Sequence, residues 1–152
     1  MIAIRPAVLE DADAMSAVLI ASITELCAAD HRNDPEAVAS WLSNKSPDRI
    51  AEWFANPAST LLVAERNGEI AAVGAFNADR MIILNYVAPQ HRFAGVSKAL
   101  LVAMEKALGP GEATLDSTLT ARPFYLAAGW HEAGPPKPYR RVDGYPMRKL
   151  IG

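Results

Sequence analysis

The chain has 152 residues, 51% of them hydrophobic, and a formal net charge of −2 at pH 7. This length and apolar content predict one compact domain, residues 1–152, and argue against two domains or a disordered linker. The slightly acidic balance supplies no broad basic surface, so we expect no nucleic-acid partner.

The cysteine count and the N-terminal sequence bear on the cellular compartment. A single cysteine, Cys27, cannot build an internal disulfide framework, and the first residues lack the basic and then apolar pattern of a secretory signal. No apolar run approaches the ~20 residues that a membrane-spanning helix needs. We therefore expect a cytoplasmic protein with no membrane partner.

The first third of the chain is typical of one strand followed by helices. Residues 1–7 alternate apolar and polar positions, which indicates a short strand, and residues 9–30 have helical periodicity after an acidic start. Two shorter helices are predicted over residues 34–44 and 46–56. In each of them a capping residue precedes a proline at the first helical position.

Strands and helices alternate in the rest of the chain. Two apolar runs joined by Asn67 and Gly68 predict a β-hairpin over residues 59–77. Residues 80–87 are nearly all apolar and predict a strand buried on both faces in the middle of a sheet. A helix to Leu108, a strand over 112–117, a helix ending at Gly129, a strand, a Pro-rich loop over 135–146 and a last strand follow. This order predicts a mixed α/β sheet layered by helices.

Gly95 follows the predicted buried strand, within the first turn of the next helix, where glycine costs roughly 1 kcal/mol relative to alanine. First-turn N–H groups lack intrahelical partners, so this turn can bind a phosphate, and a glycine lets the phosphate approach the backbone. The alternative is that Gly95 only eases packing of the helix on the sheet. Neither a Walker loop nor a dinucleotide fingerprint fits, because no glycine precedes Lys98 and further spaced glycines are missing.

Two longer motifs surround this position. The first is formed by Val87, Pro89, Arg92, Gly95, Ser97, Leu100 and Leu101. It resembles the acetyl-CoA-binding motif R/Q-x-x-G-x-G/A of the GNAT N-acetyltransferase superfamily, with Ser97 where the family usually has Gly or Ala. The residues that resemble the family's second motif, A-x-x-F-Y-x-x-x-G-F/W, are Ala121, Phe124, Tyr125, Gly129 and Trp130. On these two motifs, in this order, the chain is identified as a member of the family.

The resemblance implies both the fold and the co-substrate. The implied fold is GNAT-like and of the α/β (α+β) class, with a mixed, mostly antiparallel central sheet of about seven strands flanked by helices. Acetyl-CoA is the implied co-substrate, with its pantetheine arm beside Leu84, Asn85, Tyr86 and Val87. Its pyrophosphate is expected on the backbone N–H groups of Arg92, Phe93, Ala94, Gly95, Val96 and Ser97. Thr118, which stands where many members carry Asn, is a further expected contact.

The resemblance also implies an N-acetyltransferase that moves the acetyl group directly from acetyl-CoA to a primary amine. Such a transfer needs an uncharged amine, a stabilised oxyanion and a proton for the departing thiolate. Tyr125 matches the family's tyrosine near the CoA sulfur and is our catalytic residue; a buried core tyrosine with a satisfied hydroxyl is the alternative. The base is not identified, because Met81 stands where some members have Glu. A water relay or an amine that arrives neutral fits equally well.

The sequence does not identify the acceptor, which we expect to be a small-molecule, peptide or protein amine. The family's acceptor pocket is usually shaped by the first two helices and by the loop between the last strands. Asp30 and His31 are therefore our substrate contacts, although helix-end capping also explains the aspartate. His91 and His131 lack partners at metal-ligand spacing, so we assign no metal. A homodimer is possible, and a non-catalytic CoA-binding or interaction module is the alternative function.

Overall fold

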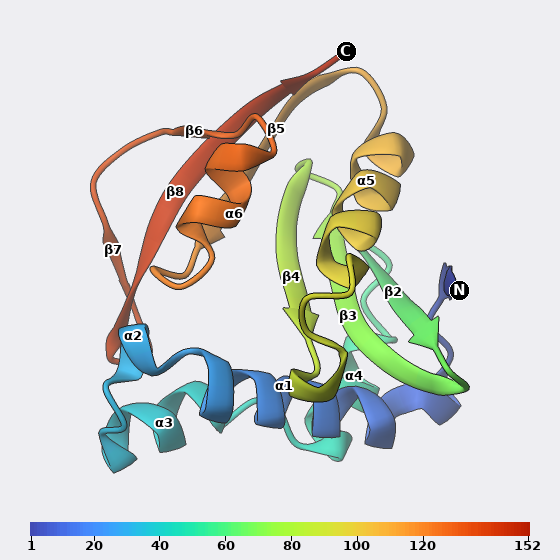
Figure 1. Cartoon of the computed structure of the whole chain (residues 1–152), viewed down its shortest axis with the longest axis vertical. Coiled ribbons are helices and arrows are strands. Elements are labelled where there is room, and N and C mark those ends of the chain that lie inside the picture. The colour runs from blue at the N-terminus through green and yellow to red at the C-terminus, as the bar shows by residue number, and fades with distance from the viewer.

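The computed structural model describes residues 1–152 (Figure 1). The strands are β1 (Ile2–Pro6), β2 (Ser59–Arg66), β3 (Glu69–Asn77), β4 (Met81–Val87), β5 (Gly111–Ser117), β6 (His131–Glu132), β7 (Lys137–Tyr139) and β8 (Val142–Ile151). The helices are α1 (Ala12–Leu26), α2 (Ala28–His31), α3 (Pro35–Leu42), α4 (Pro47–Trp53), α5 (Val96–Leu108) and α6 (Arg122–Ala127), with 3-10 turns η1 (Leu9–Asp11) and η2 (Pro89–His91).

The strands form an eight-stranded sheet in the order β1-β2-β3-β4-β5-β8-β6, and β7 pairs with β8 beside this path. Every pairing is antiparallel except that of β4 with β5. The predicted mixed, mostly antiparallel sheet flanked by helices is confirmed, with one strand more than the seven expected. The additional strand is β7, which lies in the segment predicted to be a loop.

Helices α3 and α4 and the first hairpin begin and turn where the sequence predicts, whereas the helix predicted over residues 9–30 is divided into η1, α1 and α2. A proline opens both α3 and α4, and the residue before it, Asp34 or Ser46, accepts a hydrogen bond from a first-turn N–H (3.2 and 3.3 Å). Strands β2 and β3 pair around Asn67 and Gly68, which have left-handed φ angles of 56° and 78°. None of the helices reaches the length and mean hydropathy that a membrane span requires.

Each face of the sheet carries its own core. On one face, α5 and α6 pack with β3, β4 and β5 around buried side chains that include Leu100, Met104 and Trp130. On the opposite face, α1 and α4 cover the central strands with side chains such as Leu19 and Ile50 (Figure 1). Because β3 and β4 are covered on both faces, they form the fixed part of the sheet from which β5 departs.

Strands β4 and β5 are paired only at the start of β4 and the middle of β5. Met81 pairs with Thr114 and Ile82 with Leu115, and the two strands then diverge (Figure 1). The edge of β4 that faces β5 is therefore unpaired over residues 83–87, while the other edge still pairs with β3. Ile83 is the extra residue of a bulge in β4 and is 42% exposed. The prediction that this strand is buried on both faces holds where α1 and α5 pack on it but is wrong at Ile83, where β5 has moved away.

Two further local predictions are corrected. The Pro-rich segment contains β7 and the start of β8, which form a hairpin whose turn residues Arg140 and Arg141 have φ angles of 45° and 66°. Arginine carries no signal for such a turn, whereas Asn-Gly does. Gly95 is the N-cap of α5 and does not lie in its first turn; its φ angle is 79°.

Candidate active site

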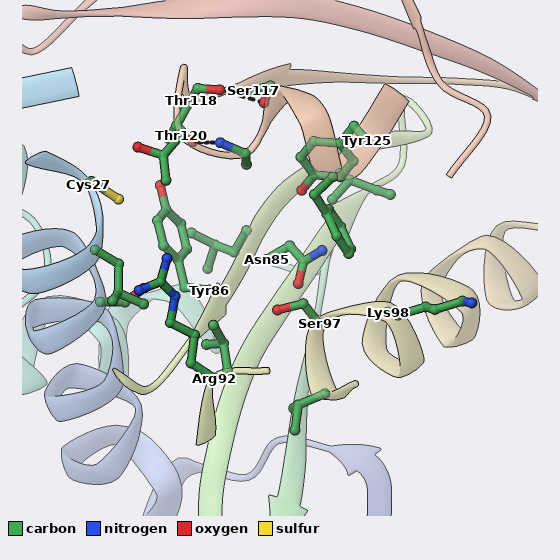
Figure 2. A pocket seen from close by; sticks show the side chains of 18 of the residues that line it. Cys27, Asn85, Tyr86, Arg92, Ser97, Lys98, Ser117, Thr118, Thr120 and Tyr125 are labelled. Atoms are coloured by element: carbon green, nitrogen blue, oxygen red, sulfur yellow. Dashed lines mark hydrogen bonds between the residues drawn. The ribbon is translucent and has the colours of Figure 1, made fainter. Parts of the chain in front are cut away.

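The divergence of β4 and β5 opens a cleft of about 390 Å³, here named the α5 cleft. Its walls come from β4, β5, η2, the start of α5, α6 and the end of α1 (Figure 2). Among the residues predicted to contact acetyl-CoA, all except Ala94 line this cleft, and so does Tyr125. The fold therefore brings both sequence motifs to one site.

The loop that leads into α5 presents a row of free backbone donors. Phe93 and Gly95 both have positive φ angles, 63° and 79°, and the N–H groups of residues 93–98 make no backbone hydrogen bond. No side chain caps the start of α5, and a Cβ added to Gly95 would meet no atom within 4 Å. Successive N–H groups at the positive end of a helix, facing open space, form a site suited to an anion such as phosphate.

One cationic residue lies on each side of Gly95 in the sequence. Arg92 and Lys98 are exposed, line the α5 cleft and take part in none of the ion pairs of the chain. The Arg92 guanidinium carbon lies 4.6 Å from the centre of the Phe93 ring. The sequence analysis did not include Lys98 among the residues of the site, although its position in the first turn of the helix after Gly95 indicated it.

Asn85 is a polar side chain without a partner in the same cleft. Both its amide nitrogen and its amide oxygen are buried, and neither makes a hydrogen bond. Buried amide groups are nearly always paired in proteins, so an unpaired one that lines a cavity suits a ligand that carries its own donors and acceptors. The free edge of β4 adds backbone groups of the same kind along residues 83–87.

Tyr125 projects from α6 into the cleft, where Figure 2 shows it beside Asn85. The side chain is 5% exposed, and its ring makes edge contacts with Phe124 and Trp130, with ring centres 5.1 and 6.0 Å apart. Burial raises the pKa of Tyr125 to about 12, although the neighbouring Asn85 amide offsets part of this effect. The phenol is therefore protonated at neutral pH.

Thr118, after β5, and Cys27, at the end of α1, also line the cleft. The Thr118 hydroxyl oxygen accepts a hydrogen bond from the Ala121 N–H (3.0 Å), so it fixes the turn into α6 and keeps its own proton for another partner. Burial raises the pKa of the Cys27 thiol to about 12, and Asp30 adds to the shift. The thiol is thus protonated at neutral pH, in keeping with a core residue.

A second cavity, about 600 Å³, lies against α3, α4 and the β7–β8 hairpin, and we name it the α4 cavity. Trp41, Trp53 and Tyr139 supply aromatic walls, and Lys45 lines it as well. Both cavities share lining residues on β4 and after β5: Ile82, Ile83, Leu84, Tyr86, Asp116, Ser117 and Thr118. The gap between the strands is therefore accessible from both sides, and Asp116 is the one carboxylate that lines both cavities.

Asp30 and His31 do not line either of these cavities. The Asp30 carboxylate accepts hydrogen bonds from the Leu119 N–H (2.6 Å), the Thr120 N–H (3.2 Å) and the Thr120 hydroxyl (2.6 Å). His31 is 2% exposed, with Nε2 2.7 Å from the Ile23 carbonyl oxygen and Nδ1 3.0 Å from a backbone N–H. Both line a smaller third cavity of about 320 Å³, and their polar atoms are engaged within the chain, which favours a structural role. Their contact with the acceptor stays a prediction.

Other acidic and histidine side chains near the sheet are also engaged. Glu65, one of the carboxylates close to the predicted fourth strand, pairs with Arg5 at 2.6 Å. His91 Nε2 lies 2.6 Å from Glu69 Oε1, and its Nδ1 lies 3.1 Å from the Arg66 guanidinium. No group of three or more His, Cys, Asp or Glu side chains is arranged to hold a metal ion.

Comparison with known proteins adds a family to this geometry. The family model described as "Acetyltransferase (GNAT) domain" matches residues 27–151. No curated protein matches the sequence. Among solved structures, a GCN5-related N-acetyltransferase from Rhodopseudomonas palustris is 24% identical with a TM-score of 0.86, covering 98% of this chain and 95% of that one.

Two other similar structures were solved with the co-substrate or its product. PaiA N-acetyltransferase from Thermoplasma acidophilum, in complex with coenzyme A, is 20% identical with a TM-score of 0.82 and covers 99% of both chains. YncA from Salmonella typhimurium, a putative acetyltransferase with its cofactor acetyl-CoA, is 19% identical with a TM-score of 0.70, covering 100% of this chain and 95% of that one. At these identities the likeness concerns the fold.

Proposed function

The chain belongs to the GNAT acetyltransferase family, and we propose that it transfers the acetyl group of acetyl-CoA directly to a primary amine of a small molecule, peptide or protein. One observation carries this proposal. The gap between β4 and β5 opens into a cavity on each side, so a thioester held in the α5 cleft and an amine held in the α4 cavity can meet between the strands.

The groups of the α5 cleft suit acetyl-CoA, which supplies the activated acetyl group when it binds. The free N–H groups of residues 93–98, with Arg92 and Lys98 beside them, would hold the pyrophosphate. The free edge of β4 and the unpaired Asn85 amide would hold the pantetheine arm, whose amide groups need such partners. Gly95 meets two demands at once, since a side chain there would strain the backbone and enter the open space.

Acyl transfer requires two proton movements that residues of the chain can serve. The amine nitrogen forms a bond to the carbonyl carbon and loses a proton, the carbon–sulfur bond breaks, and the thiolate gains a proton. Tyr125 is assigned as the proton donor, because its raised pKa keeps the phenol protonated and it lines the cleft. Asp116 is assigned as the acceptor of the amine proton, directly or through water, because it lines both cavities.

A binding measurement and a turnover measurement together test the proposal. Calorimetry with acetyl-CoA and with CoA reports the cleft, and a free-thiol assay with a panel of amines reports transfer. We expect binding together with release of CoA that depends on an added amine. Binding without turnover of any amine would favour the non-catalytic CoA-binding module, and absence of binding would contradict both.

A further inference from the structure

Lys45 is a buried cation in the wall of the α4 cavity. It lies in the turn between α3 and α4 and is 3% exposed. Its ammonium group donates one hydrogen bond, to Asn44 Oδ1 at 2.6 Å. Because a lysine ammonium has three donors, two remain without a partner of the chain.

No carboxylate of the chain neutralises this charge. Lys45 takes part in none of the ion pairs of the structure, whereas lysines this deeply buried are ordinarily paired. Burial lowers the pKa of Lys45 to about 8, and repulsion from Arg140 adds to the shift. Arg140 donates a hydrogen bond to Ser43 Oγ (2.6 Å) and also has no acidic partner. The Lys45 ammonium thus lines the cavity without a counter-charge, and the only charged neighbour that shifts its pKa, Arg140, is also positive.

Carboxylates line the α4 cavity as well. Asp116, at the gap between β4 and β5, is exposed and has no ion-pair partner. Two more carboxylates line the cavity: Glu52, which pairs with Arg49 at 3.5 Å, and Asp143, which lies at the start of β8. The cavity therefore carries charges of both signs: an unpaired carboxylate at the gap between β4 and β5, and the buried, unpaired Lys45 ammonium in the turn between α3 and α4. Lys137 is a further lining cation.

We propose that the acceptor is a small amino-carboxylate, whose carboxylate is bound by Lys45 while its amine is directed to the gap between β4 and β5. A carboxylate would give the Lys45 ammonium the missing counter-charge and hydrogen-bond acceptors, and the amine would meet Asp116. An acceptor that carries only positive charges would be repelled by the Lys45 ammonium. This inference rests on the proposed amine acetylation and specifies its substrate class.

Matched acceptor pairs test the inference on the unmodified protein. Each pair consists of an amino acid and the amine that lacks its carboxylate: phenylalanine and phenethylamine, tyrosine and tyramine, 5-aminopentanoate and butylamine. The third member of each set is the amino-acid amide, in which a neutral amide group replaces the carboxylate. We expect kcat/KM to be at least about 10-fold higher for the best carboxylate-bearing acceptor than for its partner, since hydrogen bonds to charged groups contribute this much or more.

Variants of Lys45 locate the effect. Lys45→Met removes the charge and keeps the length of the side chain, and Lys45→Gln removes the charge but keeps a donor for Asn44. Both should raise KM for the carboxylate-bearing acceptor about 10-fold or more, change KM for its partner less than about 2-fold, and leave KM for acetyl-CoA unchanged. Lys106→Met, an exposed position on α5 that lines neither cavity, is the matched control.

The outcomes separate this inference from the function on which it rests. If amines without a carboxylate are acetylated as well as their partners, the inference is overturned and the acetyltransferase function stands. If no amine of either kind is acetylated, the proposed function itself fails. Should the Lys45 variants not fold, the acceptor pairs on the unmodified protein still decide.

Discussion

The α5 cleft takes its polar groups mainly from the backbone, whereas the α4 cavity takes them from side chains. In the cleft, the N–H groups of residues 93–98 and the free edge of β4 are set by two short stretches of chain. In the cavity, the charges come from Lys45, Asp116 and the β7–β8 hairpin, which are far apart in the sequence. A backbone site needs a glycine and a local conformation, so it leaves a motif. A side-chain site assembled from distant segments leaves none.

The largest expected effect tests the backbone side of this contrast. Gly95→Glu places a negative side chain in the open space in front of the free N–H groups, so the affinity for acetyl-CoA should fall about 100-fold. Calorimetry measures the affinity. Gly68→Glu is the matched control, because Gly68 also has a positive φ angle and open space around it but lines neither cavity. Equal losses in both variants would mean that strain alone, and not a phosphate site, explains the effect.

The Tyr125→Phe variant tests whether activity also depends on a side chain of the α5 cleft. The variant keeps the ring and its contacts with Phe124 and Trp130 but removes the proton that the phenol can donate. We expect kcat to fall about 10- to 100-fold, with little change in acetyl-CoA affinity. Steady-state kinetics at a saturating amine measure it. An unchanged kcat would leave water or the substrate as the proton source.

The pH dependence of stability tests the charge state on the cavity side. Burial lowers the pKa of Lys45 from 10.5, its ordinary value, to about 8 in the folded chain, so between these pH values the unfolded chain binds one proton more than the folded chain. The folded state is therefore penalised below pH 8, and the penalty disappears as pH rises to 10.5. Relative to Lys45→Met, the wild type should gain about 3 kcal/mol in free energy of unfolding over this range. Urea titrations at several pH values measure the free energy of unfolding. A loss of stability over this pH range would instead indicate that Lys45 has an acidic partner in the folded chain.

The smallest effect concerns Asp30, which belongs to neither side. Asp30→Ala leaves the Leu119 and Thr120 donors without their acceptor, so the free energy of unfolding should fall by about 1 kcal/mol. KM should rise for both substrates together. Asp79→Ala, at an exposed turn whose side chain makes no hydrogen bond, is the control for removing a carboxylate. A rise in the acceptor KM alone would support Asp30 as a substrate contact.

Most of the fold could be predicted from the sequence because it is encoded locally. The hydrophobic period, the caps at Asp34 and Ser46, and the Asn67–Gly68 turn predict α3, α4 and the first hairpin correctly. The β7–β8 hairpin was missed, since its turn at Arg140 and Arg141 uses residues with no turn preference.

The candidate site divides in the same way. The glycine loop and Tyr125 each belong to a contiguous sequence motif, and both line the α5 cleft. Lys45 and Asp116 were missed because an isolated Lys in a polar turn, or an Asp at a strand end, is ordinarily a solvated surface residue. Only the tertiary contacts show that one is buried and the other lies at the gap.

The hydrogen bonds of Asp30 also bear on the width of the site. Strands β4 and β5 are held together by two residue pairs at one end, and beyond these nothing in the sheet limits how far they separate. At the other end, Asp30 on α2 holds Leu119 and Thr120, which follow β5, and α2 continues from α1, which packs on β4. The Asp30 carboxylate thus limits how far β4 and β5 separate at the unpaired end of the gap. If acetyl transfer takes place across this gap, as proposed, its width is set by a residue that lines neither the α5 cleft nor the α4 cavity.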